Sequence, residues 1–446
     1  MGFREDIQKM IEDTVGQIIG YATANGAAFS DIISEVHNKV NNLGVNVTER
    51  LCEEIDEIYN GQREKHIRIR NTPTSRRLMT VLGTVSIRRR LYKDMTNGRC
   101  FYAIDELLKI PKFTRVENGL QTALVERAAK GSYGAASRHI GERLTRQTVY
   151  NLTKKHAHKA VLPKNGTSEA KKIYIEADED HIHLQNGKSA EVRLVYVHEG
   201  REGVGSGRKQ LVNARYFTSV KHDDTIWEEV SGYIYGRYNV KASEIHLSGD
   251  GAVWIKNGLF HFPKAQFHLD KFHVVRSITT ACGGNSTRKS QILAALEEND
   301  TVTLNKIYGQ MVSEGYSKSE RRRIMQSRYY LENNLDEISL DKENVCSAES
   351  HVSHVLSARM SSRPMGWSIS GADRIAKLRA FMYSGGDFKT LTTERAEAPY
   401  HHTIKKVLRI FDTVGHGRYE LAHGKIAGID GKTDEISLNL RKILNF

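Results

Sequence analysis

The sequence of 446 residues predicts an α/β core with a helical insertion, preceded by a mainly helical N-terminal region. Three observations indicate this fold class. Short apolar runs alternate with helical patterns from residue 171 to 282, as in an α/β domain. A charged helical stretch follows at 286–340, and apolar residues recur at helical spacing in the first 60 residues. At this length we expect two or three domains.

Residues 1–60 predict two helices with a break at Gly26-Ala27-Ala28. Each has apolar residues every three or four positions, from Ile7 to Ile18 in the first helix and from Ile32 to Leu43 in the second. This pattern fits either a packed helical pair or a dimerisation arm.

Residues 61–160 predict a DNA-binding region made of a basic hairpin and a helix-turn-helix. The segment RRLMTVLGTVSIRRRLY has alternating apolar residues on both sides of Leu82-Gly83, which indicates two strands. A β-ribbon edged with arginine suits a phosphate backbone, although a solvated hairpin without a ligand has the same pattern. The candidate contacts are Arg76, Arg77, Arg88, Arg89 and Arg90.

Residues 117–156 of this region predict three helices. LQTALVERAAKG is amphipathic and ends at Gly131, a turn is expected at Gly141, and the last helix starts near Thr145. A recognition helix places polar residues of its first turns on base edges, where arginine and glutamine suit guanine and adenine. The expected DNA contacts are Arg146, Gln147, Lys154 and Lys155.

The α/β pattern begins after a linker at 161–170. The predicted strands are KKIYIEA, EVRLVYVHEG, LVNARYFTSV, EIHLSG and AQFHLD, with the helix TIWEEVSGYIYGRY before the fourth strand and KFHVVRSITTAC after the fifth. The rest of the chain divides into a first part of the core at 161–285, a helical insertion at 286–345, a core helix at 346–382 and an unassigned tail at 383–446.

Three carboxylates stand at the ends or starts of these elements. Asp178 follows the apolar run of the first strand, Asp250 follows the fourth strand, and Glu349 starts a helical stretch. Such carboxylates can converge on Mg²⁺, and two ions about 4 Å apart can hold the attacking and leaving oxygens of a phosphodiester displacement. Asp180 rivals Asp178, because residues i and i+2 of a strand share a face, and Glu343 rivals Glu349.

The composition favours a nucleic-acid partner. The chain has 66 Lys and Arg against 53 Asp and Glu, and its net charge of +13 suits a polyanion. We expect no membrane-spanning helix and no signal peptide, because long apolar runs are missing and acids appear early in the N-terminus. The four cysteines are far apart in the sequence, so a reducing cytoplasm is expected.

Four motifs carry a resemblance to a known family. EADEDH holds the first acid, SGDGAVWIK the second, LDKFH an Asp-x-x-His pair, and VCSAESHVSHVLSARMSSRPMGWS the third acid before an arginine-bearing helix. Together with the order of strands, these motifs resemble the ISLre-type insertion-sequence transposases, a bacterial group related to the Mutator-like elements, over about residues 60–440.

The resemblance implies a ribonuclease-H-like core with DDE chemistry. Asp178, Asp250 and Glu349 would hold two Mg²⁺ or Mn²⁺ ions, and water and then a DNA 3′-hydroxyl would be the nucleophiles. The partner would be double-stranded DNA, as terminal inverted repeats and as target, bound by a homo-oligomer at the bacterial nucleoid. The candidates for supporting the site or contacting DNA are Asp180, Asp270, His273, Arg359 and Arg363.

Two other function classes stay open. A non-catalytic DNA-binding regulator would account for the charge and the helix-turn-helix, but not for three acids that repel DNA unless metal is bound. A structure-specific nuclease or Holliday-junction resolvase could share the core, but would not need a separate sequence-reading N-terminal region. Cleavage without strand joining would favour the nuclease.

Overall fold

A computed structural model describes residues 3–24, 26–138, 144–161, 166–205, 208–221, 223–314, 317–338 and 346–393. The described chain forms two compact units, one that ends at Glu117 and one from Asn118 to Thr393. The boundary separates the basic hairpin from the helices at 118–156, which were expected in one region. Glu343, the turn at Gly141 and the tail from residue 394 lie outside the described residues.

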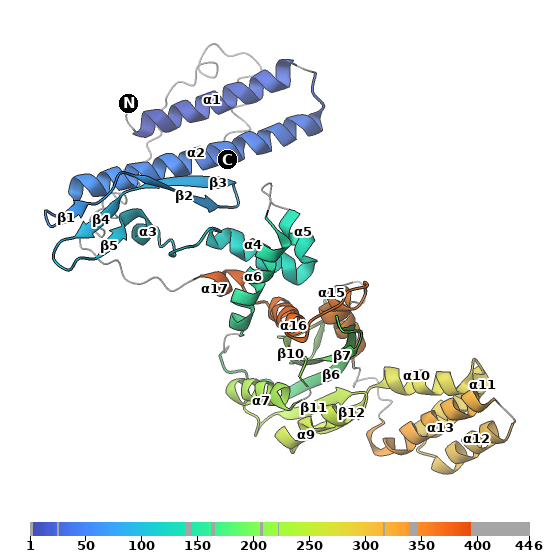
Figure 1. The fold of residues 1–446 in the computed structure, drawn as a ribbon. Helices are drawn as coiled ribbons and strands as arrows, with labels where there is room; N and C mark the ends of the chain where they lie inside the picture. Colours follow the sequence, from blue (N-terminus) through green and yellow to red (C-terminus); the bar gives the residue numbers. More distant parts are fainter. Residues whose placement is uncertain are drawn as a thin grey trace. The chain divides into compact units, whose positions relative to one another are not determined.

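The first unit begins with the two predicted helices, α1 (Phe3–Ala24) and α2 (Phe29–Gln62). They lie side by side (Figure 1), and Arg50 of α2 forms an ion pair of 2.9 Å with Asp6 of α1. Apolar side chains remain exposed along both helices, among them Ile11, Val15, Ile19, Ile33 and Val40. This apolar surface is compatible with a dimerisation arm, which stays a prediction.

The C-terminal half of α2 packs on β-structure. The predicted hairpin is present as β2 (Thr74–Met79) and β3 (Thr84–Arg89). A second sheet, in the order β1 (Ile67–Ile69), β4 (Leu91–Asp94) and β5 (Cys100–Tyr102), and the short helix α3 (Ala103–Leu107) were not predicted. Elements of three to five residues are too short to show a period in the sequence.

The second unit is built on a five-stranded mixed sheet in the order β10-β7-β6-β11-β12. The strands β6, β7 and β10 are antiparallel neighbours, whereas β6, β11 and β12 run parallel. All five strands are predicted from the sequence, and they are β6 (Lys172–His183), β7 (Ser189–His198), β10 (Arg215–Ser219), β11 (Glu244–Gly249) and β12 (Gln266–Leu269). One expectation is wrong: β6 continues to His183, so Asp178 lies in the middle of a strand and not at its end.

Helices cover both faces of this sheet. Ala177 of β6 lies in the apolar core on the side of α7 (Thr225–Arg237), whereas Ile182 lies in the core on the side of α16 (Ile369–Tyr383). Because alternate residues of a strand face opposite sides, Glu176, Asp178 and Asp180 share the α16 face. That face also carries α14 (Ala348–Val352), a π turn (Ser353–Ser357) and α15 (Ala358–Met360), while α8 (Val253–Lys256) and α9 (Gly258–His261) follow β11.

The segment predicted as a helical insertion is helical and has its own apolar core. It consists of α10 (Lys271–Cys282), α11 (Ser286–Glu297), α12 (Thr301–Ser313) and α13 (Lys318–Glu332) (Figure 1). α10 also contributes to this core, although it precedes residue 286, where the insertion was expected to begin.

The expected helices at 117–156 are also present. They are α4 (Asn118–Lys130), α5 (Tyr133–Arg138) and α6 (Arg146–His156), and they pack against one another, while α4 also contacts α16 and α17 (Phe388–Thr392). Within the described ranges, no helix is both long enough and apolar enough to cross a membrane.

Candidate functional site

The parallel pairing of β6 and β11 brings the first two acids to the same level of the sheet. Ser248 of β11 lies opposite Glu176 of β6. Asp250 follows Ser248 by two residues, and Asp178 follows Glu176 by two, so the register carries both carboxylates to neighbouring positions. The turn after β11 depends on Gly251, whose φ of +89° suits glycine, and a Cβ there would come within 3.0 Å of Leu269.

Asp178 is buried, with 6% of its surface exposed. Its Oδ1 accepts a hydrogen bond of 2.8 Å from the backbone amide of Glu179, whereas its Oδ2 has no hydrogen-bond partner among the described residues. Burial raises the pKa of Asp178 to about 7, and the negative charges of Asp250, Glu179 and Glu349 add to the effect. A cation at this point would satisfy Oδ2 and offset the repulsion between the acids.

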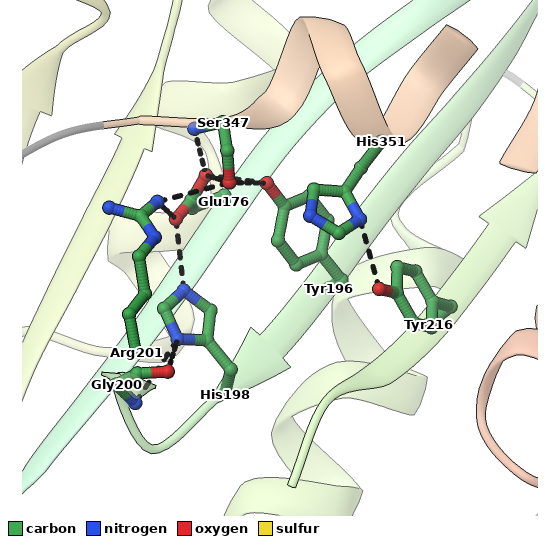
Figure 2. Close-up of polar contacts among 8 residues, drawn as sticks. All are labelled: Glu176, Tyr196, His198, Gly200, Arg201, Tyr216, Ser347 and His351. Atoms are coloured by element: carbon green, nitrogen blue, oxygen red, sulfur yellow. Dashed lines mark hydrogen bonds and ion pairs between the residues drawn. The ribbon is translucent and has the colours of Figure 1, made fainter. Parts of the chain in front are cut away.

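Glu349 lies in the first turn of α14 and is exposed. Its helix is attached to the sheet by Ser347, whose backbone amide and hydroxyl both donate to Oε2 of Glu176, at 2.5 and 3.1 Å (Figure 2). The distance of Glu349 from Asp178 is therefore set through a neighbouring residue of the same strand.

Glu176 is the centre of a buried polar network that was not expected from the sequence. Besides Ser347, it accepts from Tyr196 Oη at 2.5 Å and from Arg201 Nη2 at 2.7 Å, and its Oε1 lies 2.9 Å from His198 Nε2 (Figure 2). Arg201 belongs to β8 (Arg201–Gly203), which pairs with β9 (Lys209–Leu211). Although burial opposes ionisation, His198, Arg201 and Tyr196 lower the pKa of Glu176 to about 2.

Asp180 shares a face with Asp178 but has a different partner. Both of its carboxylate oxygens lie within 3.0 Å of the Ser361 hydroxyl, which donates to them. Asp178 instead has one oxygen without a partner in the described part of the chain, beside Asp250 and Glu349. The surroundings therefore favour Asp178 over Asp180 as the ligand.

Asp270 and His273 reach the same place from α10. The backbone amide of Asp270 donates to the carbonyl of Gly249 at 2.7 Å, directly before Asp250. Asp270 caps α10, since its Oδ1 accepts from the amide of Phe272. One ligand atom each of Asp178, His273 and Glu349 lie within 4.8 Å of one another, and no other group of this kind occurs in the described part of the chain.

A pocket of about 370 Å³ opens beside Asp250 and His273 and extends between α10 and α13. Its lining includes the exposed arginines Arg276 and Arg323, together with Ser277 and Tyr330. The Tyr330 hydroxyl donates to the backbone carbonyl of Asp250 at 3.0 Å, which fastens the insertion to the sheet. One end of the pocket therefore lies at the carboxylates, and its side carries the positive charges of Arg276 and Arg323.

Arg359 was expected to support the site or contact DNA, but its surroundings do not favour DNA contact. It is 5% exposed, its Nε donates to the carbonyl of Ala128 near the end of α4, and its guanidinium lies over the Trp367 ring. Burial lowers its pKa to about 10. Arg359 therefore supports the fold, whereas Arg363 is exposed and can still reach a ligand.

Three arginines of the basic hairpin that were expected to contact DNA form ion pairs within the fold. Arg76 and Arg89 both pair with Asp105, and Arg90 pairs with Asp56 and Glu57. These side chains are largely buried and point toward acids of the first unit, which does not favour contact with a phosphate backbone. Exposed candidates are Arg77 and Arg88, the latter at 3.8 Å from Glu53.

The expected recognition helix keeps its polar surface. Thr145 caps α6 by accepting from the amide of Thr148. Arg146, Gln147, Lys154 and Lys155 are all exposed, and Gln147 donates to Asn151 one turn later. These positions are compatible with DNA contact, which remains a prediction.

Comparison with known proteins identifies the family. Residues 22–397 match the model of the uncharacterised protein family UPF0236. The chain belongs to UPF0236. A UPF0236 protein of Caldanaerobacter subterraneus subsp. tengcongensis is 34% identical over 399 residues, which cover 87% of this chain and 83% of the relative. Its name joins several locus designations.

More distant similarities exist. A UPF0236 protein in the vanSb 3′ region of Streptococcus gallolyticus is 26% identical over 242 residues, covering 50% of this chain and 52% of the relative. A solved structure, the Drosophila P element transposase strand transfer complex, aligns with 71% of this UPF0236 protein and 91% of its own chain, at 11% identity and a TM-score of 0.21. A TM-score this low does not establish a common fold.

The sequence contains a signal for the Glu176 network, but only in retrospect. Glu176, Asp178 and Asp180 alternate in YIEADED, and the segment VYVHEGRE supplies Tyr196, His198 and Arg201. Alternation predicts that three acids share one face. It does not indicate which acid is neutralised by histidine and arginine and which is left for a cation.

Proposed function

We propose that this UPF0236 protein is a DNA transposase that cuts and joins the ends of an insertion sequence by metal-dependent phosphodiester transfer. The observation that carries the proposal is the buried Oδ2 of Asp178, which has no hydrogen-bond partner in the described ranges and lies beside Asp250 and Glu349 in a chain of net charge +13. The sheet order β10-β7-β6-β11-β12, with β7 antiparallel to both neighbours, supports a ribonuclease-H-like core.

The donor set suits Mg²⁺ or Mn²⁺. Asp178, Asp250 and Glu349 offer carboxylate oxygens, which hard divalent cations prefer. When bound, two such ions would lower the proton affinity of an attacking oxygen and offset charge on the phosphate. The residues of the chain supply the position: β6 and β11 hold the two aspartates level, and the contact of Ser347 with Glu176 holds the helix of Glu349.

DNA contacts are proposed on three surfaces. Arg77 and Arg88 of the hairpin would contact the phosphate backbone, and Arg146 and Gln147 of α6 would read base edges. The pocket of Arg276 and Arg323 would hold phosphates next to the cut. Under this proposal the partners are element ends and target DNA bound by a homo-oligomer. The name of the Caldanaerobacter relative joins several locus designations, which is compatible with a mobile element.

The test is strand transfer with purified protein, Mg²⁺ or Mn²⁺, and DNA that carries the element's ends. We expect nicking followed by joining, and loss of both steps in Asp250→Asn and Glu349→Gln while DNA binding stays nearly intact. Cleavage of any DNA without joining would instead make the protein a nuclease. DNA binding without cleavage in the presence of any metal would favour a non-catalytic DNA-binding regulator. Full activity of Asp250→Asn would refute the assignment of Asp250 as a catalytic residue.

Sequence reading is tested separately with the same full-length protein. Arg146→Ala and Gln147→Ala should reduce the preference for element ends over random DNA, because a lost base contact costs about 1–3 kcal/mol of discrimination. Lys154→Ala should weaken both DNAs about equally. An unchanged preference in all three variants would place sequence recognition outside α6.

A further inference from the structure

We propose that His273 is a metal ligand, so that one cation position is held by Asp178, His273 and Glu349 and has a mixed nitrogen and oxygen shell. The inference deepens the proposed function and rests on it, since it changes the ligand set of the same site. It concerns metal choice, which can be measured without DNA chemistry.

The position of His273 is set by backbone contacts. β12 pairs in parallel with β11, with Leu269 opposite Gly249. The amide of Asp270 donates to the Gly249 carbonyl, and α10 starts immediately afterwards, so His273 lies in the first turn of a helix anchored beside Asp250. The histidine therefore reaches the acids from a fixed helix and not from a loop.

The imidazole has an atom available for a cation. His273 Nε2 is buried and has no hydrogen-bond partner among the described residues; the carboxylate nearest to it, Asp270 Oδ2, is 3.8 Å away. Asp178 Oδ2 is likewise buried and unpartnered. A buried polar atom without a partner is costly, and a cation held by both side chains would relieve this cost at each of them.

The separation of the ligand atoms fits an ion. One atom each of Asp178, His273 and Glu349 lie within 4.8 Å of one another. Opposite ligands of an octahedral ion are about 4.2 Å apart at metal–oxygen distances near 2.1 Å. At least two of the three pairs must be neighbouring ligands, which are about 3.0 Å apart, so the side chains would need to close by up to about 2 Å. Glu349 is exposed and can make this adjustment, while Asp178 and the helix of His273 stay in place.

The nitrogen ligand has a chemical consequence. Mg²⁺ strongly prefers oxygen ligands, whereas the imidazole nitrogen is accepted well by transition metals, and Mn²⁺ lies between these classes. The position of His273 should therefore select Mn²⁺ over Mg²⁺. Asp250 then belongs mainly to the second position, which it shares with Asp178 and where oxygen ligands prevail.

The experiment uses the full-length protein with Mn²⁺ alone as the probe. Electron spin echo spectroscopy of bound Mn²⁺ should show coupling to the ¹⁴N of a directly bound imidazole. The coupling should disappear in His273→Ala and persist in His158→Ala, a matched control because His158 is exposed on the turn Ala157–Lys159. Mn²⁺ affinity at that position should fall at least about tenfold in His273→Ala, as outer-shell losses alone reach that size.

A second variant keeps the test valid if alanine disturbs the fold. His273→Asp replaces the nitrogen with an oxygen, and it should lower the preference for Mn²⁺ over Mg²⁺ at least about tenfold in a competition titration. Nitrogen coupling that survives in His273→Ala would overturn the inference, and so would Mn²⁺ bound by the wild type without coupling; in the latter case the proposed function stands. Wild-type protein that binds no Mn²⁺ would overturn both.

Discussion

Replacing Asp178 by asparagine should stabilise the metal-free protein at neutral and alkaline pH. The pKa of Asp178 is about 7 in the folded chain, against an ordinary value of 3.8. The folded state therefore binds this proton more tightly than the unfolded state. The contribution of Asp178 to stability is most favourable below about pH 4, falls as the pH rises from about 4 to about 7, and is constant above that, because folding must then keep a charged carboxylate buried.

The magnitude follows from the difference between the two pKa values. About three pH units at 1.36 kcal/mol each correspond to about 4 kcal/mol at pH 8, as an upper figure. Asp178 is 6% exposed, so solvent does little to reduce it. Asparagine has a similar shape and no charge, and we expect Asp178→Asn to gain about 2–4 kcal/mol at pH 8 and almost nothing at pH 4. For a chain of this size that raises the melting temperature by roughly 2–4 °C.

The assay is thermal unfolding between pH 4 and pH 8, with and without Mg²⁺. The wild type should gain stability from Mg²⁺ at pH 8, because the cation offsets the buried charge, and Asp178→Asn should gain little. Asp180→Asn is the comparison on the same strand face: burial raises the pKa of Asp180 too, but its carboxylate accepts a hydrogen bond from the Ser361 hydroxyl, so its gain at pH 8 should be smaller than that of Asp178→Asn. The reasoning is refuted if Asp178→Asn melts below the wild type at pH 8 without metal, or retains the wild-type dependence on pH.

Three further predictions concern positioning and DNA contact. Glu176→Gln should raise the Mn²⁺ concentration needed for half-maximal strand transfer, because the helix of Glu349 loses its charged anchor for Ser347, and excess Mn²⁺ should partly restore the rate; an unchanged metal requirement would contradict this. Arg77→Ala and Arg88→Ala should weaken binding to all DNA and reduce its salt dependence, each by about one unit of log–log slope, whereas Arg89→Ala should mainly lower the melting temperature through Asp105. Arg276→Ala and Arg323→Ala should weaken DNA binding in Ca²⁺ more than Arg321→Ala, which lies outside the pocket lining; equal effects would argue against a phosphate subsite.

Local pattern was sufficient for most of the secondary structure. The five strands of the large sheet, the two N-terminal helices, the hairpin and the helical insertion all follow from apolar periodicity, which neighbouring residues determine together. Asp250 after β11 and Glu349 at the start of α14 could be placed for the same reason. Asp178 was placed at a strand end because its apolar run stops early, while pairing with β7 extends β6 to His183.

The partners of the charged residues were decided only by the tertiary structure. Arg89 and Arg359 are indistinguishable from surface arginines in the sequence, yet one pairs with Asp105 and the other donates to Ala128, far away in the chain. Glu176 and Asp178 stand two positions apart on one strand face. Glu176 contacts His198 and Arg201, whereas one oxygen of Asp178 has no partner among the residues that the structure describes. Periodicity reports which side of an element is buried, because that depends on near neighbours. The choice between an ion pair inside the fold and a site for a cation or a phosphate depends on which distant segments the fold brings within a few ångströms.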